Sequence, residues 1–258
     1  MAAAAAARLD VVALTDHDTT AGWEEAALAG GVTLVRGAEL SCRHDGISLH
    51  LLAYLFDPSD APLSDVMRAL RDSRVGRAER MVQLLVDDGH PVTWDQVRSL
   101  AGGTVGRPHI GQALIDHGLV GSLDEAFGPD WIGTGGRYWS GKRELDVVEA
   151  IGLVKAAGGV TVFAHPAAAA RGQVVPESAI AELAAAGLDG LEVAHPDHPP
   201  ATQARMADLA RDLGLVVTGS SDFHGSNKDV PLGAYLTAAE ALEQLVDRAT
   251  GVPVLHQA

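Results

Sequence analysis

Short apolar runs that end at a polar residue recur along the chain and alternate with segments of helical periodicity. Apolar runs of about four to eight residues are typical of strands buried on both faces. They occupy residues 11–14, 32–35, 160–164, 189–193 and 215–219. Apolar residues at helical spacing predict helices over residues 2–8, 21–29, 64–88, 145–157, 177–186, 200–213 and 238–249. Strands that alternate with helices indicate parallel βα units, so the predicted fold class is α/β.

The middle of the chain interrupts this alternation. After the helix at 64–88, short helices are expected near residues 93–100, 108–117 and 124–127, followed by a glycine-rich loop at 128–138. We therefore predict a barrel whose first part is residues 1–59 and whose second part is residues 141–258. Residues 60–140 form an inserted helical subdomain in this prediction.

Composition narrows the possible partners and compartment. The 19 basic and 34 acidic residues give a net charge of −15, which argues against general binding to duplex DNA or to an anionic membrane. A single cysteine, Cys42, excludes an internal disulfide and favours a reducing compartment. No apolar run reaches the roughly 20 residues that span a bilayer, and the alanine run at 2–7 lacks the basic region of a signal peptide. The expected location is the cytoplasm.

Imidazoles and carboxylates lie where the apolar runs end, at Asp16, His17, Glu39, His50, His165, Asp222 and His224. Strand ends of a parallel barrel meet on one face, so these side chains are predicted to converge there. Nitrogen and oxygen ligands of this kind suit a metal centre. Taken singly, residues 16–18 could be a helix-capping turn and His50 a core histidine with one hydrogen-bonded partner. Their coincidence at separate strand ends favours the metal centre. Asp222 and His224 are expected on the same side of an extended segment.

Six motifs resemble, in order, those of the PHP (polymerase and histidinol phosphatase) family. They are LTDHD at 14–18, GAE at 37–39, the segment around His50, GRPHI at 106–110, FAHP at 163–166 and SDFHG at 221–225. The GRPHI segment resembles the branch of nucleoside 3′,5′-bisphosphate phosphatases and 5′-to-3′ exoribonucleases. The resemblance implies a distorted (β/α)7 barrel with a trinuclear centre of manganese, iron or zinc that hydrolyses phosphate esters.

The resemblance also implies a ligand set. One metal would be held by Glu39, His50 and His165, a second by His17 and His224, and a third by Asp222 with a share of Glu39. His165, Asp222 and His224 are the implied catalytic residues.

The family begins with a strand that ends in a His-x-His motif and is followed by an aspartate. This chain begins in what would be the helix after that strand, so the first barrel strand is expected to be missing. Either the sequence begins at an internal start, or the protein is a natural form with an incomplete metal site. An open seam is expected between residues 9–14 and the strand near Val216, with unpaired edges.

Substrate contacts are expected from four residues. Arg107, on a Gly-Arg-Pro turn, suits bidentate contact with a phosphate, although a surface arginine at a helix end is the alternative. Arg137 in the glycine-rich loop is a weaker candidate. The resemblance suggests Asp16 and His195 as further contacts, with a solvated loop as the alternative for residues 195–198.

A row of five arginines, at positions 68, 71, 74, 77 and 80, spirals around its helix, because a three-residue step slips by about 60° per step. We expect a solvated helix with one or two arginines facing the site, not an RNA-binding stripe.

The predicted function is a metal-dependent phosphoesterase that acts on nucleoside 3′,5′-bisphosphates or short RNA 5′ ends, most simply with manganese. A degenerate PHP barrel with weak metal or ligand binding is one alternative. A histidinol-phosphate phosphatase is another, and Arg107 argues against it.

Overall fold

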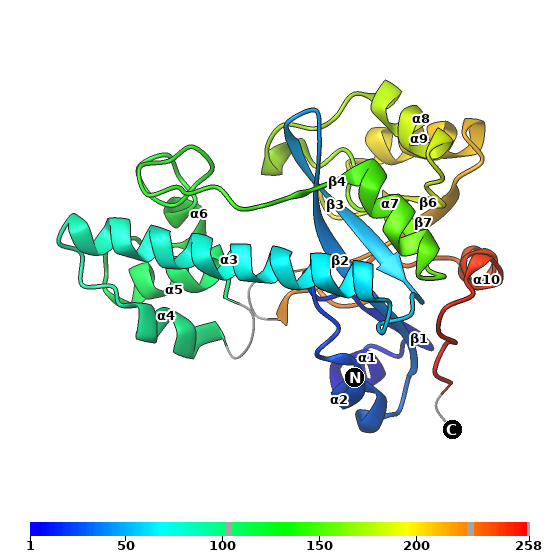
Figure 1. The fold of residues 1–258 in the computed structure, drawn as a ribbon, viewed down its shortest axis with the longest axis horizontal. Coiled ribbons are helices and arrows are strands. Elements are labelled where there is room, and N and C mark those ends of the chain that lie inside the picture. The colour runs from blue at the N-terminus through cyan, green and yellow to red at the C-terminus, as the bar shows by residue number, and fades with distance from the viewer. Residues whose placement is uncertain (102–104, 226–229, 257–258) are drawn as a thin grey trace. The chain divides into compact units, whose positions relative to one another are not determined.

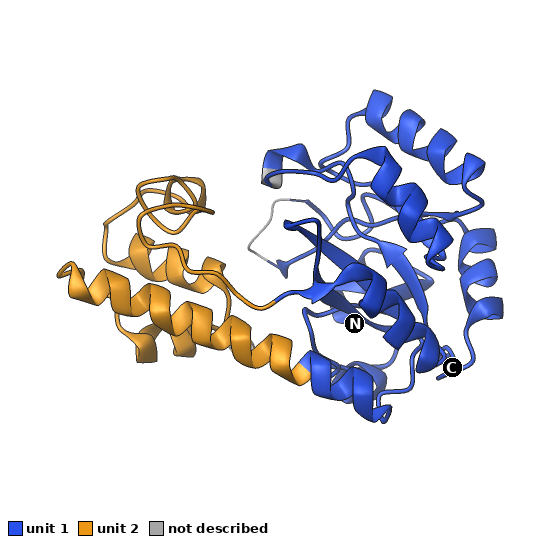
Figure 2. Cartoon of the chain, turned by 45° about the horizontal axis from the view of Figure 1, so that its top comes forward, with its two compact units in different colours: residues 1–67, 144–258 blue, residues 68–143 orange. Residues whose placement is uncertain are grey.

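The computed structural model describes residues 1–101, 105–225 and 230–256. Two compact units divide the chain: unit 1 comprises Met1–Met67 and Glu144–Ala258, and unit 2 comprises Arg68–Arg143 (Figure 2). The predicted domain boundaries at 59/60 and 140/141 stay predictions, and the compact units divide at 67/68 and 143/144.

Unit 1 is built on a seven-stranded mixed sheet in the order β1-β2-β3-β5-β6-β7, with β4 paired to β2 (Figure 1). The strands are β1 (Val11–Leu14), β2 (Thr33–His44), β3 (Ile47–Tyr54), β4 (Leu145–Asp146), β5 (Val160–Phe163), β6 (Gly190–Ala194) and β7 (Val216–Gly219). β1 and β7 stand at the two ends of this order, with no ladder joining them among the described residues. The association hazard expected of such edges stays a prediction.

The parallel arrangement expected of the βα units does not extend to β3. This strand is antiparallel to both β2 and β5, whereas β1–β2, β5–β6 and β6–β7 are parallel. Asp45 and Gly46 join β2 to β3 with φ of 47° and 80°. Two central residues with positive φ fit the type I′ turn of a tight hairpin. Glu39 and His50 therefore lie inside long strands and not at strand ends.

The helices of unit 1 follow the predicted apolar periodicity within a few residues. They are α1 (Ala2–Ala6), α2 (Trp23–Ala29), α7 (Val147–Ala156), α8 (Glu177–Ala185), α9 (Pro200–Asp212) and α10 (Ala239–Arg248). A short 3-10 helix, η1 (Ala169–Arg171), was not predicted. Asp146 caps α7 by accepting the backbone N–H groups of Val148 and Glu149 at 2.9 and 3.2 Å. Ala241 and Leu245 of α10 pack against a cluster that includes Val162 of β5.

Unit 2 holds most of α3 (Ala61–Asp87) together with α4 (Trp94–Ala101), α5 (Arg107–Asp116) and α6 (Leu123–Ala126). Its core includes Met81, Leu85, Ile110 and Leu114, all fully buried. No helix in the described part of the chain is long and apolar enough to cross a membrane.

The five arginines of α3 differ in exposure, as expected of a solvated helix with one or two arginines turned inward, and the prediction that these face the site stays a prediction. Arg74 and Arg77 are only 7% and 6% exposed, whereas Arg80 is exposed and donates to Ser140 Oγ and Gly141 O at 2.9 Å. Packing against neighbouring segments decides which arginines are buried, and this cannot be predicted from the three-residue spacing alone.

Candidate metal centre

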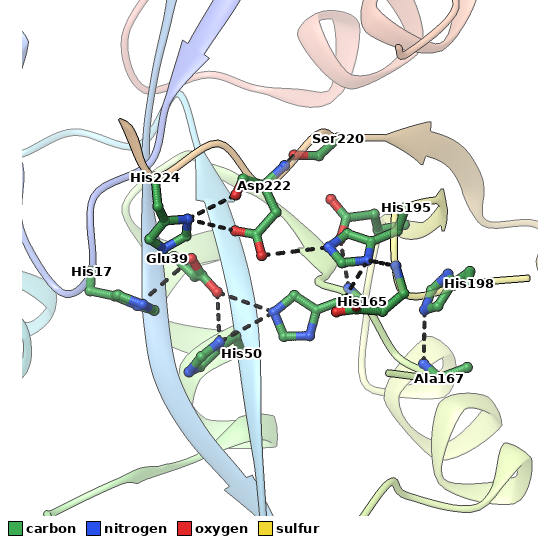
Figure 3. A network of polar contacts seen from close by, with 12 residues as sticks. His17, Glu39, His50, His165, Ala167, His195, His198, Ser220, Asp222 and His224 are labelled. Atoms are coloured by element: carbon green, nitrogen blue, oxygen red, sulfur yellow. Dashed lines mark hydrogen bonds and ion pairs between the residues drawn. The ribbon is translucent and has the colours of Figure 1, made fainter. Parts of the chain in front are cut away.

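Three ligand-bearing side chains meet at the carboxylate of Glu39 (Figure 3). Glu39 Oε1 lies 2.6 Å from His50 Nδ1 and 3.3 Å from His165 Nε2. The two imidazole nitrogens are 3.3 Å apart. The other oxygen, Glu39 Oε2, lies 3.7 Å from His17 Nδ1. One carboxylate thus faces three imidazoles, with two of them on one oxygen and the third on the other.

Strand register brings these residues together. Ser41 of β2 pairs with His50 of β3, so Glu39 lies two residues along β2 on the same face as Ser41. The Ala164 N–H donates to the His50 carbonyl at 3.2 Å and continues the β3–β5 ladder. That bond places the next residue, His165, beside the His50 ring, with ring centroids 5.2 Å apart.

The segment after β1 is held against the middle of β2. Glu39 N–H donates to Asp16 O at 3.2 Å, and Asp18 N–H donates to Glu39 O at 3.0 Å. Asp18 is completely buried, and its carboxylate accepts the Ser41 N–H at 2.7 Å and the Ser41 hydroxyl at 2.8 Å. Asp18 therefore anchors the loop that presents His17, a role that the sequence pattern did not assign to it.

Asp222 and His224 form a second group of polar side chains beside His17. His224 Nδ1 lies 3.3 Å from Asp222 Oδ1 and 2.8 Å from the Asp222 carbonyl oxygen. The His17 and His224 ring centroids are 6.2 Å apart. The side chains meet as expected, but the predicted extended backbone is wrong, because Asp222 has φ of 47°.

The electrostatics of the cluster keep Glu39 ionised. Burial alone would raise the pKa of Glu39, but the charges of His17 and His50 and hydrogen bonds from His165 and His50 hold that pKa well below its usual range. Nearby Glu192 behaves in the opposite way, because burial raises its pKa to about 8. The cluster thus contains an anionic carboxylate surrounded by imidazoles.

The spacing of these atoms fits a divalent ion. Nitrogen and oxygen ligands lie about 2.0–2.2 Å from zinc-like ions, so ligand atoms in a tetrahedral arrangement are about 3.4 Å apart. Two of the three separations among Glu39 Oε1, His50 Nδ1 and His165 Nε2 are 3.3 Å. The third, 2.6 Å, is that of a hydrogen bond, in which a proton on His50 takes the position between the two atoms. His17, Glu39 and His50 also offer ligand atoms within 4.8 Å of one another.

Two predicted substrate contacts lie in unit 1. The Asp16 side chain is exposed, in keeping with a group that can meet a ligand. His195 is fully buried and faces Asp222, with Nε2 3.6 Å from Oδ2, and His198 is 2% exposed. The alternative of a solvated loop is therefore wrong for both histidines, and the complete burial of His195 also argues against the substrate contact predicted for it.

The two predicted phosphate contacts lie in unit 2. Arg107 donates to Thr134 Oγ1 at 3.3 Å and lies over the Phe127 ring at 5.1 Å. Burial, and then the charge of Arg74, lowers the pKa of Arg107. Arg137 pairs with Asp88 at 2.7 Å. Arg107 begins α5, and His109 fixes that turn by accepting the Gly106 N–H on Nδ1 at 3.0 Å.

Sequence comparison finds relatives over most of the chain, although no family model matches it. It is 29% identical to the 5′-3′ exoribonuclease of Haemophilus influenzae, over 91% of this chain and 86% of that protein. It is 30% identical to the 3′,5′-nucleoside bisphosphate phosphatase of Chromobacterium violaceum, over 86% of this chain and 79% of that protein. A solved structure from Bifidobacterium adolescentis, named as a metal-dependent phosphoesterase, matches with a TM-score of 0.90 at 36% identity and covers 96% of this chain and 88% of that one.

The fold and the cluster of imidazoles around the buried Glu39 carboxylate, together with these relatives, define a phosphoric ester hydrolase of the metal-dependent class. Within that class, the chain belongs to the PHP-like family represented by the Chromobacterium violaceum bisphosphate phosphatase.

Proposed function

We propose that the chain hydrolyses phosphate monoesters of nucleoside 3′,5′-bisphosphates or of short RNA 5′ ends, with manganese as the working metal and iron or zinc as its competitors. The observation that carries this proposal is the Glu39 carboxylate, with one oxygen 2.6 and 3.3 Å from two imidazole nitrogens. A site with three protein ligands and an open position is the usual form of a catalytic metal site.

The ligand roles follow the two oxygens of Glu39. Glu39, His50 and His165 would hold one ion, because their ligand atoms already lie within bridging distance. His17 with His224 would serve a second position, and Asp222 with a share of Glu39 a third. Divalent ions bound there would supply Lewis-acid activation of water and of the phosphoryl group.

The chain's own side chains would bind and orient the substrate. Arg107 is proposed to bind the second phosphate of a bisphosphate or the nucleotide backbone, since a planar guanidinium can make two parallel hydrogen bonds to phosphate oxygens. Asp16 is proposed as a further contact because its side chain is exposed beside the ligand-bearing loop. Arg137 is the weaker candidate, since it already pairs with Asp88.

The test is hydrolysis of adenosine 3′,5′-bisphosphate and of adenosine 5′-monophosphate in a matched manganese buffer. We expect His165→Ala to abolish both activities, because it removes one of three ligands. His44→Ala is the matched control, since the His44 side chain is 12% exposed, as is that of His165, yet it pairs with Glu182 at 3.4 Å and not with the Glu39 cluster. Undiminished hydrolysis by His165→Ala would show that this cluster is not the catalytic centre. Complete inactivity of the metal-loaded parent chain would favour a degenerate barrel.

Arg107→Ala separates binding from chemistry. A hydrogen bond to a charged group is worth about 1.5–3 kcal/mol, so the KM for the bisphosphate should rise about 10–100-fold. Hydrolysis of the monophosphate should stay within about threefold of the parent. An equal loss on both substrates would contradict the assignment of Arg107 to the second phosphate.

A further inference from the structure

Residues 192–198, at the end of β6 and in the loop after it, contact two of the candidate ligands, and Figure 3 shows His195 of this segment beside Asp222. Glu192 Oε2 accepts the backbone N–H of His165 at 2.7 Å. His195 Nε2 lies 3.6 Å from Asp222 Oδ2. Glu192 and His195 are 2% and 0% exposed, so neither is free to meet a substrate in this conformation. These two buried side chains therefore contact the candidate ligands His165 and Asp222 and are not exposed to solvent.

The two supported ligands both have left-handed backbone conformations. His165 has φ of 36° and Asp222 has φ of 47°. Residues with a Cβ adopt this region uncommonly, and it persists where the surroundings hold it. At His165 the surroundings include the buried Glu192 carboxylate, which accepts the backbone N–H of that residue. Glu192 thus stabilises the backbone turn that aims the His165 imidazole at Glu39.

The protonation of His195 is set by its own loop. The backbone N–H of Asp197 donates to His195 Nδ1 at 3.0 Å, so that nitrogen is an acceptor without a proton. A neutral imidazole then carries its proton on Nε2, the atom that faces the Asp222 carboxylate. From 3.6 Å, a small approach would let Nε2 donate to Asp222 if that carboxylate holds an ion.

His198 connects the same loop to the segment after His165. Its Nδ1 donates to Val193 O at 2.9 Å, and its Nε2 accepts the Ala167 N–H at 3.2 Å. The loop after β6 therefore binds the backbone just after His165, through the Ala167 N–H, while Glu192 accepts the N–H of His165 itself.

We propose that Glu192 and His195 are positioning residues of the metal centre, the first for His165 and the second for Asp222. The inference rests on the proposed function of that centre. Groups behind metal ligands fix the direction of the ligand atoms, and their loss typically weakens metal binding about 10–100-fold.

The experiment is calorimetric titration of the full chain with Mn²⁺, for the parent, Glu192→Ala and Glu192→Gln. Asp189 provides a matched control on the same chain segment. It is 6% exposed, and its carboxylate accepts the N–H of Thr161 in β5 at 3.0 Å, as Glu192 accepts that of His165 just after β5. Asp189→Ala thus removes a buried carboxylate-to-backbone link at the opposite end of β5, together with the ion pair between Asp189 and Lys155 at 3.2 Å.

We expect Glu192→Ala to weaken Mn²⁺ binding about 10–100-fold. Glu192→Gln should recover most of the affinity, because its amide oxygen can still accept the His165 N–H. Asp189→Ala should lower the unfolding temperature yet keep Mn²⁺ affinity within about threefold of the parent, since no ligand depends on it. Raising Mn²⁺ should restore kcat in Glu192→Ala, as expected of a residue that positions a ligand and does not touch substrate.

Parent-like affinity in Glu192→Ala would overturn the role of Glu192, and so would an equal loss of affinity in Asp189→Ala. If Glu192→Ala does not fold, the Gln variant and the pair His195→Ala and His195→Gln decide the question. A glutamine at position 195 can place a donor near the former Nε2 atom, so the His195→Gln variant should bind Mn²⁺ more tightly than His195→Ala. Equal Mn²⁺ affinities of the two variants would refute the positioning role of His195. A parent chain that binds no Mn²⁺ would instead refute the proposed metal centre itself.

Discussion

Replacing Glu39 by Gln should disable the metal centre. Glu39 is 6% exposed and its oxygens face three imidazoles, so the change removes the anion at the centre of the cluster while keeping its shape. Breaking a buried charged contact by removing one partner costs about 3–5 kcal/mol. At about 1.4 kcal/mol per factor of ten, Mn²⁺ affinity should fall about 10²–10⁴-fold.

The assay is Mn²⁺ titration calorimetry, followed by hydrolysis of a 3′,5′-bisphosphate at saturating Mn²⁺. Glu182→Gln is the matched control, because it neutralises a glutamate that also pairs with a histidine, His44, but is 65% exposed. This control should leave affinity and turnover unchanged, since exposed ion pairs contribute little. Glu39→Gln binding Mn²⁺ within threefold of the parent would refute the assignment of Glu39 as the shared ligand.

Three further predictions concern the stability of the metal-free protein. Burial raises the pKa of Glu192 from 4.5 to about 8, so the stability that protonated Glu192 provides is fully present below pH 4.5 and is lost as the pH rises through 8. In urea unfolding, Glu192→Gln should lack this decline with pH. A pH profile of stability identical to that of the parent would contradict the raised pKa of Glu192. Tyr138→Phe removes the hydroxyl that donates to Asp88 at 2.8 Å, and thermal unfolding should show a loss of about 0.5–1.5 kcal/mol, while turnover of the manganese-loaded protein should match the parent. Gly37→Ala would bring a Cβ to 2.8 Å from the Ala53 carbonyl oxygen, so urea unfolding should show a loss of about 1–3 kcal/mol in the free energy of unfolding. An unchanged urea midpoint would show that β2 and β3 can move apart to admit the added Cβ.

Local periodicity predicted most helices and strands, because these segments carry their own apolar pattern. The helix expected at 200–213 is α9 at Pro200–Asp212, and the strand expected at 160–164 is β5 at Val160–Phe163. The direction of β3 was missed, although the Asp45-Gly46 pair is a strong hairpin signal in the sequence. A run of apolar residues shows that a strand is buried, but it does not show which way the strand runs.

The sequence predicted which residues form the candidate site, but it did not predict the residues that position them. Glu39, His50 and His165 are polar interruptions of apolar runs, and the structure places them together, although their roles as ligands stay predictions. Glu192 also interrupts an apolar strand, but nothing in the sequence pairs it with a backbone N–H 27 residues away. The burial of Arg74 was equally hidden, because helix spacing does not report what packs against each face.

The central claim is that Glu39, His50 and His165 hold a divalent ion. Crystals grown with Mn²⁺ and measured at its absorption edge test this claim most directly. An anomalous peak about 2.0–2.3 Å from Glu39 Oε1, His50 Nδ1 and His165 Nε2 is the predicted result. Anomalous density elsewhere on the chain, with the side chains of these three residues still in contact with one another and no peak between them, would contradict it.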